Sequence, residues 1–184
     1  MGFALRKNEF ASTDDFLAWE ETQTEKYEYV GGEIYAMVGA RLAHAEIALN
    51  VAAALKSALR GTPCRAFISD VKLQVDVDTF YPDVLVTCDA ADLNAESVVK
   101  SPKVIIEVLS PSTAAYDRGR KFQAYRGVAS LQEYVLIDPD LRTIDIFRRT
   151  VEDNWLLVAS EAARGLVLTS LDFVAAPETV FENV

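Results

Sequence analysis

Two carboxylates stand where hydrophobic strands would bury them. Glu107 interrupts the apolar run 104–108, and Asp83 leads directly into the apolar run 84–86. An ionised carboxylate is costly to bury without a partner, so each position needs a reason. If the two runs are neighbouring strands, the acids lie side by side, and a hard divalent cation would relieve their repulsion. Carboxylate oxygens completed by water suit Mg²⁺ or Mn²⁺.

Each of these residues also has an ordinary structural explanation. Glu107 could pair with an arginine or reach solvent at a strand end, and Asp83 follows a proline in a common turn pair. Lys121, the third candidate, lies four residues after Asp117, the spacing of an ordinary surface ion pair on a helix. If that helix packs on the sheet, Lys121 instead turns inward beside Glu107. The residues by themselves leave these alternatives open.

A longer ordered set of motifs runs from about residue 13 to residue 171. Its members are Glu28-Tyr29-Val30-Gly31-Gly32-Glu33, His44, Pro82-Asp83, Glu107-Val108-Leu109-Ser110-Pro111-Ser112-Thr113, Asp117, Lys121, Tyr125, Gly127-Val128, Glu133-Tyr134 and Asp138-Pro139. In order and spacing this set resembles the Uma-two family of proposed restriction endonucleases, within the PD-(D/E)XK nuclease superfamily. The whole set carries the resemblance, because none of its dipeptides is diagnostic.

The resemblance implies an α/β (α+β) fold, a restriction-endonuclease-like mixed β-sheet flanked by helices, in one domain over residues 1–184. It implies a Mg²⁺ (or Mn²⁺) ion held by Asp83, Glu107 and the backbone carbonyl of Val108. The superfamily motif has a lysine two residues after the glutamate, where this chain has Leu109. The resemblance therefore makes Lys121, from the following helix, the substitute.

Glu33 and His44 also match family positions, so we expect them to line the site as further catalytic residues. For His44 the alternative is a capping or surface role near the start of a helix. The expected function is metal-dependent endonuclease cleavage of a DNA substrate. Two other interpretations remain: a catalytically inactive nuclease-fold binding module, favoured by Leu109 in the lysine position, and a protein that uses its carboxylates only in structural ion pairs.

Charge and composition restrict how such a protein meets nucleic acid. The 184 residues carry a net charge of −10, from 28 acidic and 18 basic side chains. This balance argues against non-specific binding to nucleic acid or to an anionic membrane. The segment 100–126 differs, with six basic and two acidic residues. We expect this segment to approach the DNA backbone, with the acidic surface directed elsewhere or with basic surfaces pooled in an oligomer.

Other features predict the setting and assembly of the chain. The first residues contain no apolar segment of the kind found in export signals, so we expect a cytoplasmic protein. The apolar stretch 42–59 contains charged residues, so we expect no membrane span. Cys64 and Cys88 are accordingly predicted to be unpaired. We expect a homodimer, because the apolar run 155–158 would form an edge strand that needs covering.

The elements that must position these residues are predicted from the spacing of apolar residues and from turn and capping residues. Helices are predicted over 13–24, 42–60 and 114–126, with apolar positions 47, 51, 55, 58 and 59 of the second facing the core. A Gly-Gly pair between two aromatic runs predicts a hairpin of 27–30 with 33–38. Further strands are predicted at 65–69, 71–77, 84–88, 103–109, 133–137, 143–148 and 155–159.

Overall fold

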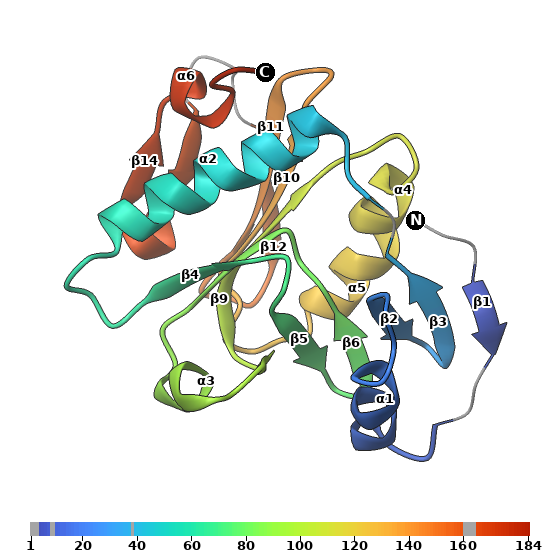
Figure 1. Ribbon diagram of the computed structural model, residues 1–184. Helices are drawn as coiled ribbons and strands as arrows, with labels where there is room; N and C mark the ends of the chain where they lie inside the picture. The colour runs from blue at the N-terminus through green and yellow to red at the C-terminus, as the bar shows by residue number, and fades with distance from the viewer. Residues whose placement is uncertain (1–3, 8–9, 38, 160–164) are drawn as a thin grey trace.

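The computed structural model describes residues 4–7, 10–37, 39–159 and 165–184. Its larger core sheet holds six strands within these residues, in an order that puts the strand of Glu107 in the interior (Figure 1). From one edge to the other they are β12 (Trp155–Ala159), β11 (Thr143–Arg149), β10 (Glu133–Asp138), β9 (Pro102–Val108), β7 (Val84–Thr87) and β4 (Arg65–Ile68). The pair β9–β10 is parallel and the other pairs are antiparallel, so the sheet is mixed.

A second, smaller sheet also has six strands within the described part, but they are shorter on average. All of them lie between residues 4 and 99. Its order is β1 (Ala4–Lys7), β3 (Glu33–Ala36), β2 (Tyr27–Val30), β6 (Asp78–Phe80), β5 (Lys72–Val75) and β8 (Val98–Val99). The predicted hairpin is present, and its turn residues Gly31 and Gly32 both have positive φ, which a two-residue turn of this kind requires. A side chain on Gly31 would also collide with the guanidinium of Arg120.

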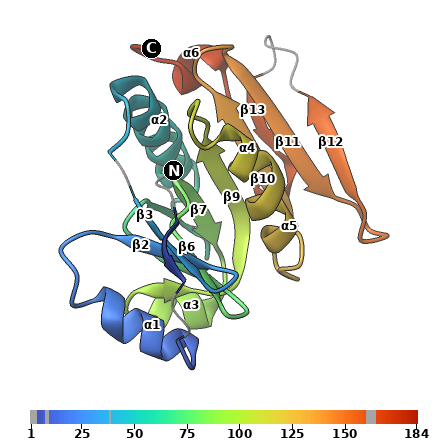
Figure 2. The same cartoon turned by 90° about the vertical axis from the view of Figure 1, so that its right-hand side faces the viewer.

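Helices and a small hairpin cover the sheets (Figure 2). They are α1 (Thr13–Glu20), α2 (Leu42–Ala58), α3 (Ala90–Asn94), the consecutive α4 (Ala114–Tyr116), η1 (Asp117–Lys121) and α5 (Phe122–Tyr125), the hairpin β13 (Leu166–Leu168) and β14 (Phe173–Ala175) joined by η2 (Thr169–Leu171), and α6 (Pro177–Val180). None of the described helices is long and apolar enough to cross a membrane.

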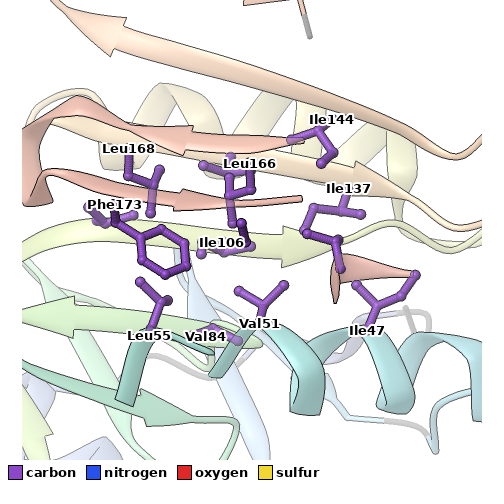
Figure 3. Close-up of a cluster of buried hydrophobic side chains, with 14 of the residues drawn as sticks. Ile47, Val51, Leu55, Val84, Ile106, Ile137, Ile144, Leu166, Leu168 and Phe173 are labelled. Atoms are coloured by element: carbon purple, nitrogen blue, oxygen red, sulfur yellow. The ribbon is translucent and has the colours of Figure 1, made fainter. Parts of the chain in front are cut away.

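The core lies on both faces of the larger sheet. On one face, α2 and the β13–β14 hairpin pack on alternate residues of the central strands, as Figure 3 shows. On the other face, α5 covers the residues in between, with Tyr125 fully buried. Ile106 belongs to the first cluster and Ile105 to the second, because successive side chains of a strand point to opposite faces. Glu107 therefore emerges on the α5 side.

The predicted mixed α+β fold is confirmed, with differences in detail. The expected strand 71–77 ends at Val75, because Asp76 adopts a left-handed backbone (φ +52°) and turns the chain into β6. The predicted helix 114–126 contains a π-helical turn, η1. In α2 the apolar positions 47, 51, 55 and 59 are buried as expected, whereas Ala58 is exposed. Position 38 of the predicted hairpin lies outside the described residues.

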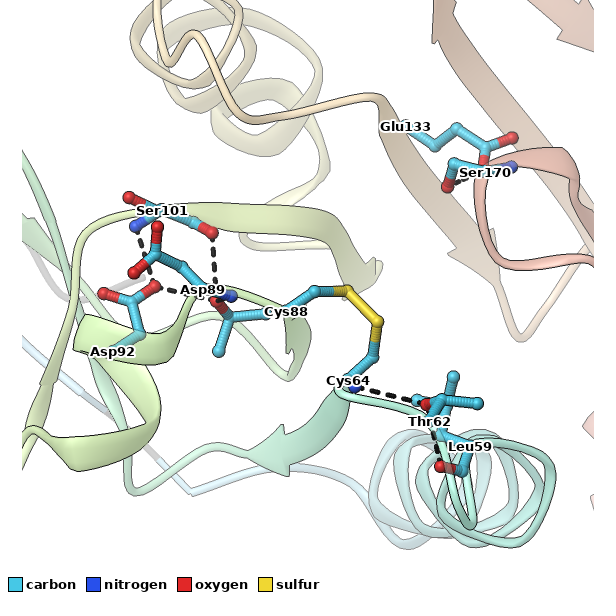
Figure 4. The surroundings of a disulfide bond; sticks show 10 residues. Leu59, Thr62, Cys64, Cys88, Asp89, Asp92, Ser101, Glu133 and Ser170 are labelled. Carbon is cyan, nitrogen blue, oxygen red and sulfur yellow. Dashed lines mark hydrogen bonds between the residues drawn. A yellow bond between two sulfur atoms is a disulfide. The ribbon is translucent and has the colours of Figure 1, made fainter.

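The prediction that Cys64 and Cys88 are unpaired is wrong. In the structure they form a disulfide, with Cα atoms 4.0 Å apart (Figure 4). The cause is the antiparallel register of β4 and β7, in which Arg65 faces Thr87 and the next residues outward are the two cysteines. Cysteine count and compartment could not reveal this, because the pairing of two strands distant along the chain brings the thiols together.

Candidate active site

The two carboxylates named from the sequence lie opposite each other on adjacent strands. In the β7–β9 pair Val84 is the partner of Ile106, so the residues that follow in register are Asp83 and Glu107. Facing residues of an antiparallel pair project to the same side of the sheet. Asp83 is also tied to β9 directly, because its Oδ2 accepts a hydrogen bond of 2.7 Å from the backbone N–H of Val108.

Lys121 extends inward from η1 to the Glu107 side chain. Its Nζ donates a hydrogen bond of 2.9 Å to Glu107 Oε1, and the Tyr125 hydroxyl donates to the same oxygen at 3.0 Å. The ammonium also lies 3.3 Å from Glu28 Oε1 and 3.6 Å from Asp117 Oδ1. Only 8% of the lysine side chain is exposed. The outward-facing surface pair that the sequence left open is therefore not what forms.

The local helix explains why these side chains converge. Asp117, Lys121 and Tyr125 are spaced by four residues, so they occupy one side of a continuous helical segment. That side faces β9, and the Tyr134 hydroxyl of β10 donates a 2.9 Å hydrogen bond to the Asp117 carbonyl oxygen. A π-helical turn is often found at functional sites. Here Lys121 is the last residue of the turn.

His44 enters the site from the first turn of α2. Its Nε2 lies 3.0 Å from Asp83 Oδ1, and its side chain is mostly buried. Burial is the largest influence on the pKa of His44 and lowers it. The hydrogen bond and the charge of Asp83 outweigh burial, so the pKa lies above its usual value.

Glu33 lies apart from this cluster. Its Oε2 accepts a hydrogen bond from the Tyr35 hydroxyl and lies 3.5 Å from Arg120 Nη1. Arg120 in turn donates to the Val30 carbonyl oxygen at 3.0 Å, so this group holds the β2–β3 hairpin against η1. The pocket described next is lined by Tyr35 but not by Glu33.

A pocket of about 560 Å³ exposes the cluster to solvent. Its acidic, basic and histidine lining residues are Glu28, Arg41, His44, Asp83, Glu107, Asp117 and Lys121. Tyr116 also lines it, and its buried hydroxyl makes no hydrogen bond to any described residue. The remaining wall comes from α2, the end of β4, the loop after β9, Tyr81, and the end of β3 with Met37, Gly39 and Ala40.

Negative charge exceeds positive charge at the centre of the pocket. Burial raises the pKa of Glu107 well above its usual value; Lys121 opposes this, and the charges of Asp83, Asp117 and Glu28 add to it. The pKa of Asp117 is raised for the same first reason, burial. Burial lowers the pKa of Lys121, yet the surrounding carboxylates raise it well above its ordinary value. The lysine is thus held as an ammonium among three acids, Glu107, Glu28 and Asp117.

The donor set fits a hard divalent cation. Asp83, Glu107 and the carbonyl of Val108 offer oxygen ligands, which Mg²⁺ and Mn²⁺ prefer, and the excess carboxylate charge favours a cation. As the side chains stand, no group of three or more His, Cys, Asp or Glu residues in the described chain is arranged to hold a metal. An ion here would need water and the backbone carbonyl to complete its ligands.

Glu28 and Asp117 were missed as site residues, although both belong to motifs noted in the sequence. Glu28 alternates with aromatic residues in Tyr27-Glu28-Tyr29, a pattern typical of a solvent-facing position on a strand. In the structure it is buried and accepts a 3.1 Å hydrogen bond from the Tyr81 N–H. Only the packing of the second sheet against η1 reveals its role beside Lys121.

A solved structure from Anabaena variabilis, described as "a putative nuclease belonging to DUF820", superposes with a TM-score of 0.75 at 18% identity, over 92% of this chain and 97% of that one. The architecture is thus that of the restriction-endonuclease-like class of mixed α+β folds. The model of the Uma2 family, described as "Putative restriction endonuclease", matches residues 13–176.

Two proteins of Synechocystis sp. are close in sequence. The uncharacterized protein slr1290 is 36% identical over 175 residues, covering 94% of this chain and 92% of that protein. The uncharacterized protein sll1609 is 34% identical over 147 residues, covering 78% and 83%. The chain belongs to the Uma2 family, as its motifs predicted.

Proposed function

We propose that this protein is a metal-dependent endonuclease that hydrolyses DNA phosphodiester bonds in the pocket above β7 and β9. The observation that supports it most is the facing pair Asp83 and Glu107 with the Lys121 ammonium 2.9 Å from Glu107, all on one solvent-accessible pocket. This combination supplies what the reaction needs: ligands for a cation, and a fixed positive charge beside them. Membership of the Uma2 family agrees with it.

In this proposal Asp83, Glu107 and the Val108 carbonyl hold Mg²⁺ or Mn²⁺. When bound, such an ion lowers the pKa of a water and polarises the phosphoryl group. The hydrogen bond from the Val108 N–H to Asp83 Oδ2 keeps the aspartate side chain directed at β9. The hydrogen bond from the Tyr125 hydroxyl holds the Glu107 carboxylate in place.

Lys121 would act on the substrate as a charge. Because the surrounding carboxylates keep it protonated, it is suited to donate hydrogen bonds to a phosphoryl oxygen or to orient the attacking water, rather than to remove a proton. Leu109 fills the position of the superfamily lysine and is buried in the α5-side core. Lys121 reaches Glu107 from η1, the next helical segment of the chain.

His44 is proposed to position Asp83 through the 3.0 Å contact with Oδ1. Glu33 is proposed to act only at a distance, by holding Arg120 and the hairpin against η1. This revises the role that we expected for Glu33, from a residue that touches the substrate to one that supports the segment carrying Lys121.

Plasmid cleavage tests the proposal. Supercoiled DNA incubated with the protein should be nicked or linearised in Mg²⁺ or Mn²⁺ and remain intact in EDTA. Asp83→Asn should abolish the cleavage, whereas Asp14→Asn, on the exposed side of α1, should retain it. DNA binding without any metal-dependent cleavage by the folded wild type would refute the endonuclease and favour the inactive binding module.

A further inference from the structure

Part of the pocket wall is apolar in a way that core packing does not explain. Leu49 on α2 and Ile68 at the end of β4 both line the pocket, and 57% and 48% of these residues remain exposed. Neither belongs to the buried clusters found in the described chain. Large apolar side chains kept in solvent beside a polar centre are typical of ligand sites.

The same pocket is poor in available positive charge. Its described lysines and arginines are Lys121, which faces three carboxylates, and Arg41, whose guanidinium is held by both carboxylate oxygens of Asp140. Arg118 and Arg120, on the adjoining η1, pair with Asp145 and Glu33. Binding a duplex through its backbone requires several phosphate contacts from cationic side chains, and the net charge of −10 adds to the difficulty.

A single strand can bind in a different way. An unpaired base offers an apolar face that can rest against side chains, and this contribution is independent of backbone charge. The volume of about 560 Å³ lies within the range that accommodates a small organic ligand, so a nucleotide with its base turned out of a stack can enter. The apolar wall and the acidic centre would then contact different parts of one nucleotide.

We infer, resting on the proposed endonuclease function, that the substrate is single-stranded or locally unpaired DNA. An unstacked base lies against Leu49 and Ile68, and its phosphate is directed to Asp83, Glu107 and Lys121. The site thereby discriminates by base access rather than by the number of phosphate contacts. Fully paired DNA is a poor substrate, because its bases remain stacked and its backbone finds few free cations.

Matched oligonucleotides test this inference. A labelled 30-residue strand should be cleaved in Mg²⁺ at least about tenfold faster than the same strand in a blunt duplex, the scale of a lost apolar contact in a binding pocket. Leu49→Ser and Ile68→Ser should each lower kcat/KM for the single strand about tenfold. Val151→Ser, at an exposed turn after β11, is the control and should leave the rate unchanged.

The outcomes separate this inference from the proposed function. Equal cleavage of duplex and single strand overturns the inference, and so does a wild-type rate in both Leu49→Ser and Ile68→Ser. Either result leaves the endonuclease proposal intact. If the folded protein cleaves neither, the endonuclease proposal fails, and fluorescence anisotropy with the same two probes decides the inference. Tighter binding of the single strand that is lost in Leu49→Ser supports it, and equal binding of the two probes overturns it.

Discussion

Lys121 is surrounded by more negative charge than its ammonium can neutralise. Three carboxylates, those of Glu28, Glu107 and Asp117, lie within 3.6 Å of Nζ. The charge of Asp83 also raises the pKa of Glu107. Removing the lysine charge would leave these buried carboxylates without their cation, which is destabilising. The arrangement therefore holds the lysine fixed while the excess acid charge remains available to a cation.

At this scale Lys121→Ala is expected to reduce single-turnover DNA cleavage by about 10²-fold or more, the usual effect of a positioned electrostatic group. Mg²⁺ affinity, measured by calorimetric titration, should be nearly unchanged, because the carboxylates bind the ion. Lys56→Ala, on the exposed face of α2, is the matched control. Lys121→Met retains the bulk of the stem, and the circular dichroism of both variants shows whether each one folds without the charge. A wild-type cleavage rate in the folded variants would remove Lys121 from the mechanism.

Asp83→Asn should separate the effect of the Asp83 charge from the effect of its hydrogen bond with Val108. The asparagine oxygen can still accept the Val108 N–H bond, while one of four crowded charges is removed. In EDTA the free energy of unfolding should stay equal or rise by up to about 1 kcal/mol. At 100 times the Kd, Mg²⁺ should stabilise the wild type by about 2.7 kcal/mol and the variant far less. Thermal melts with and without Mg²⁺ measure both; a variant much less stable in EDTA would identify Asp83 as a purely structural residue.

Among the elements, β4 forms the edge of the larger sheet beside β7. None of its four residues is fully buried, so few side-chain contacts hold it beyond its backbone pairing. The disulfide between Cys64 and Cys88 fastens one end of this strand pair. The other end of β4 leads to Ile68 and the pocket wall. The bond thus stabilises an element that shapes the site.

Reduction of this disulfide is expected to lower the free energy of unfolding by about 2–4 kcal/mol, because the bond closes a loop of moderate length in the unfolded chain. Urea unfolding with and without a reductant measures the difference. The double variant Cys64→Ala/Cys88→Ala should be as unstable as the reduced wild type and should not respond to reductant. Identical urea midpoints for the oxidised and reduced wild type would show that the bond does not contribute.

At the scale of the whole molecule, β12 is the other edge of the larger sheet and is apolar. Leu156 is 57% and Leu157 51% exposed on this strand. An exposed apolar edge strand is a template for pairing with another chain. The homodimer expected from the sequence therefore stays a prediction with a defined surface, and the assignment of residues 1–184 to one domain likewise stays a prediction.

Sedimentation equilibrium at micromolar concentration should give twice the mass of the 20.3 kDa chain. Leu156→Lys combined with Leu157→Lys should give a monomer, because the charges resist edge pairing. Val174→Lys, at an exposed position of β14, is the control that should remain dimeric. A monomeric wild type would exclude the β12 interface.

Much of the architecture could be read from the chain because its signals are local. The apolar run around Glu107 predicts a central buried strand, the Gly-Gly pair predicts the first hairpin, and the spacing of Ile47, Val51 and Leu55 predicts the inward face of α2. Short elements such as β6, β8 and the β13–β14 hairpin carry too few residues for a periodic signal. They form because the larger elements offer them partners.

For the site, the sequence alone determined which residues were candidates. Asp83 and Glu107 stand out because they adjoin or interrupt apolar runs, and Lys121 because the family resemblance makes it the substitute for the lysine missing at Leu109. Only the tertiary structure decided the rest. It placed Glu28 beside Lys121, moved Glu33 to a supporting pair with Arg120, and joined Cys64 to Cys88. Each of these outcomes depends on the register or packing of segments far apart in the chain. Such long-range contacts leave no periodic trace in the residues that make them.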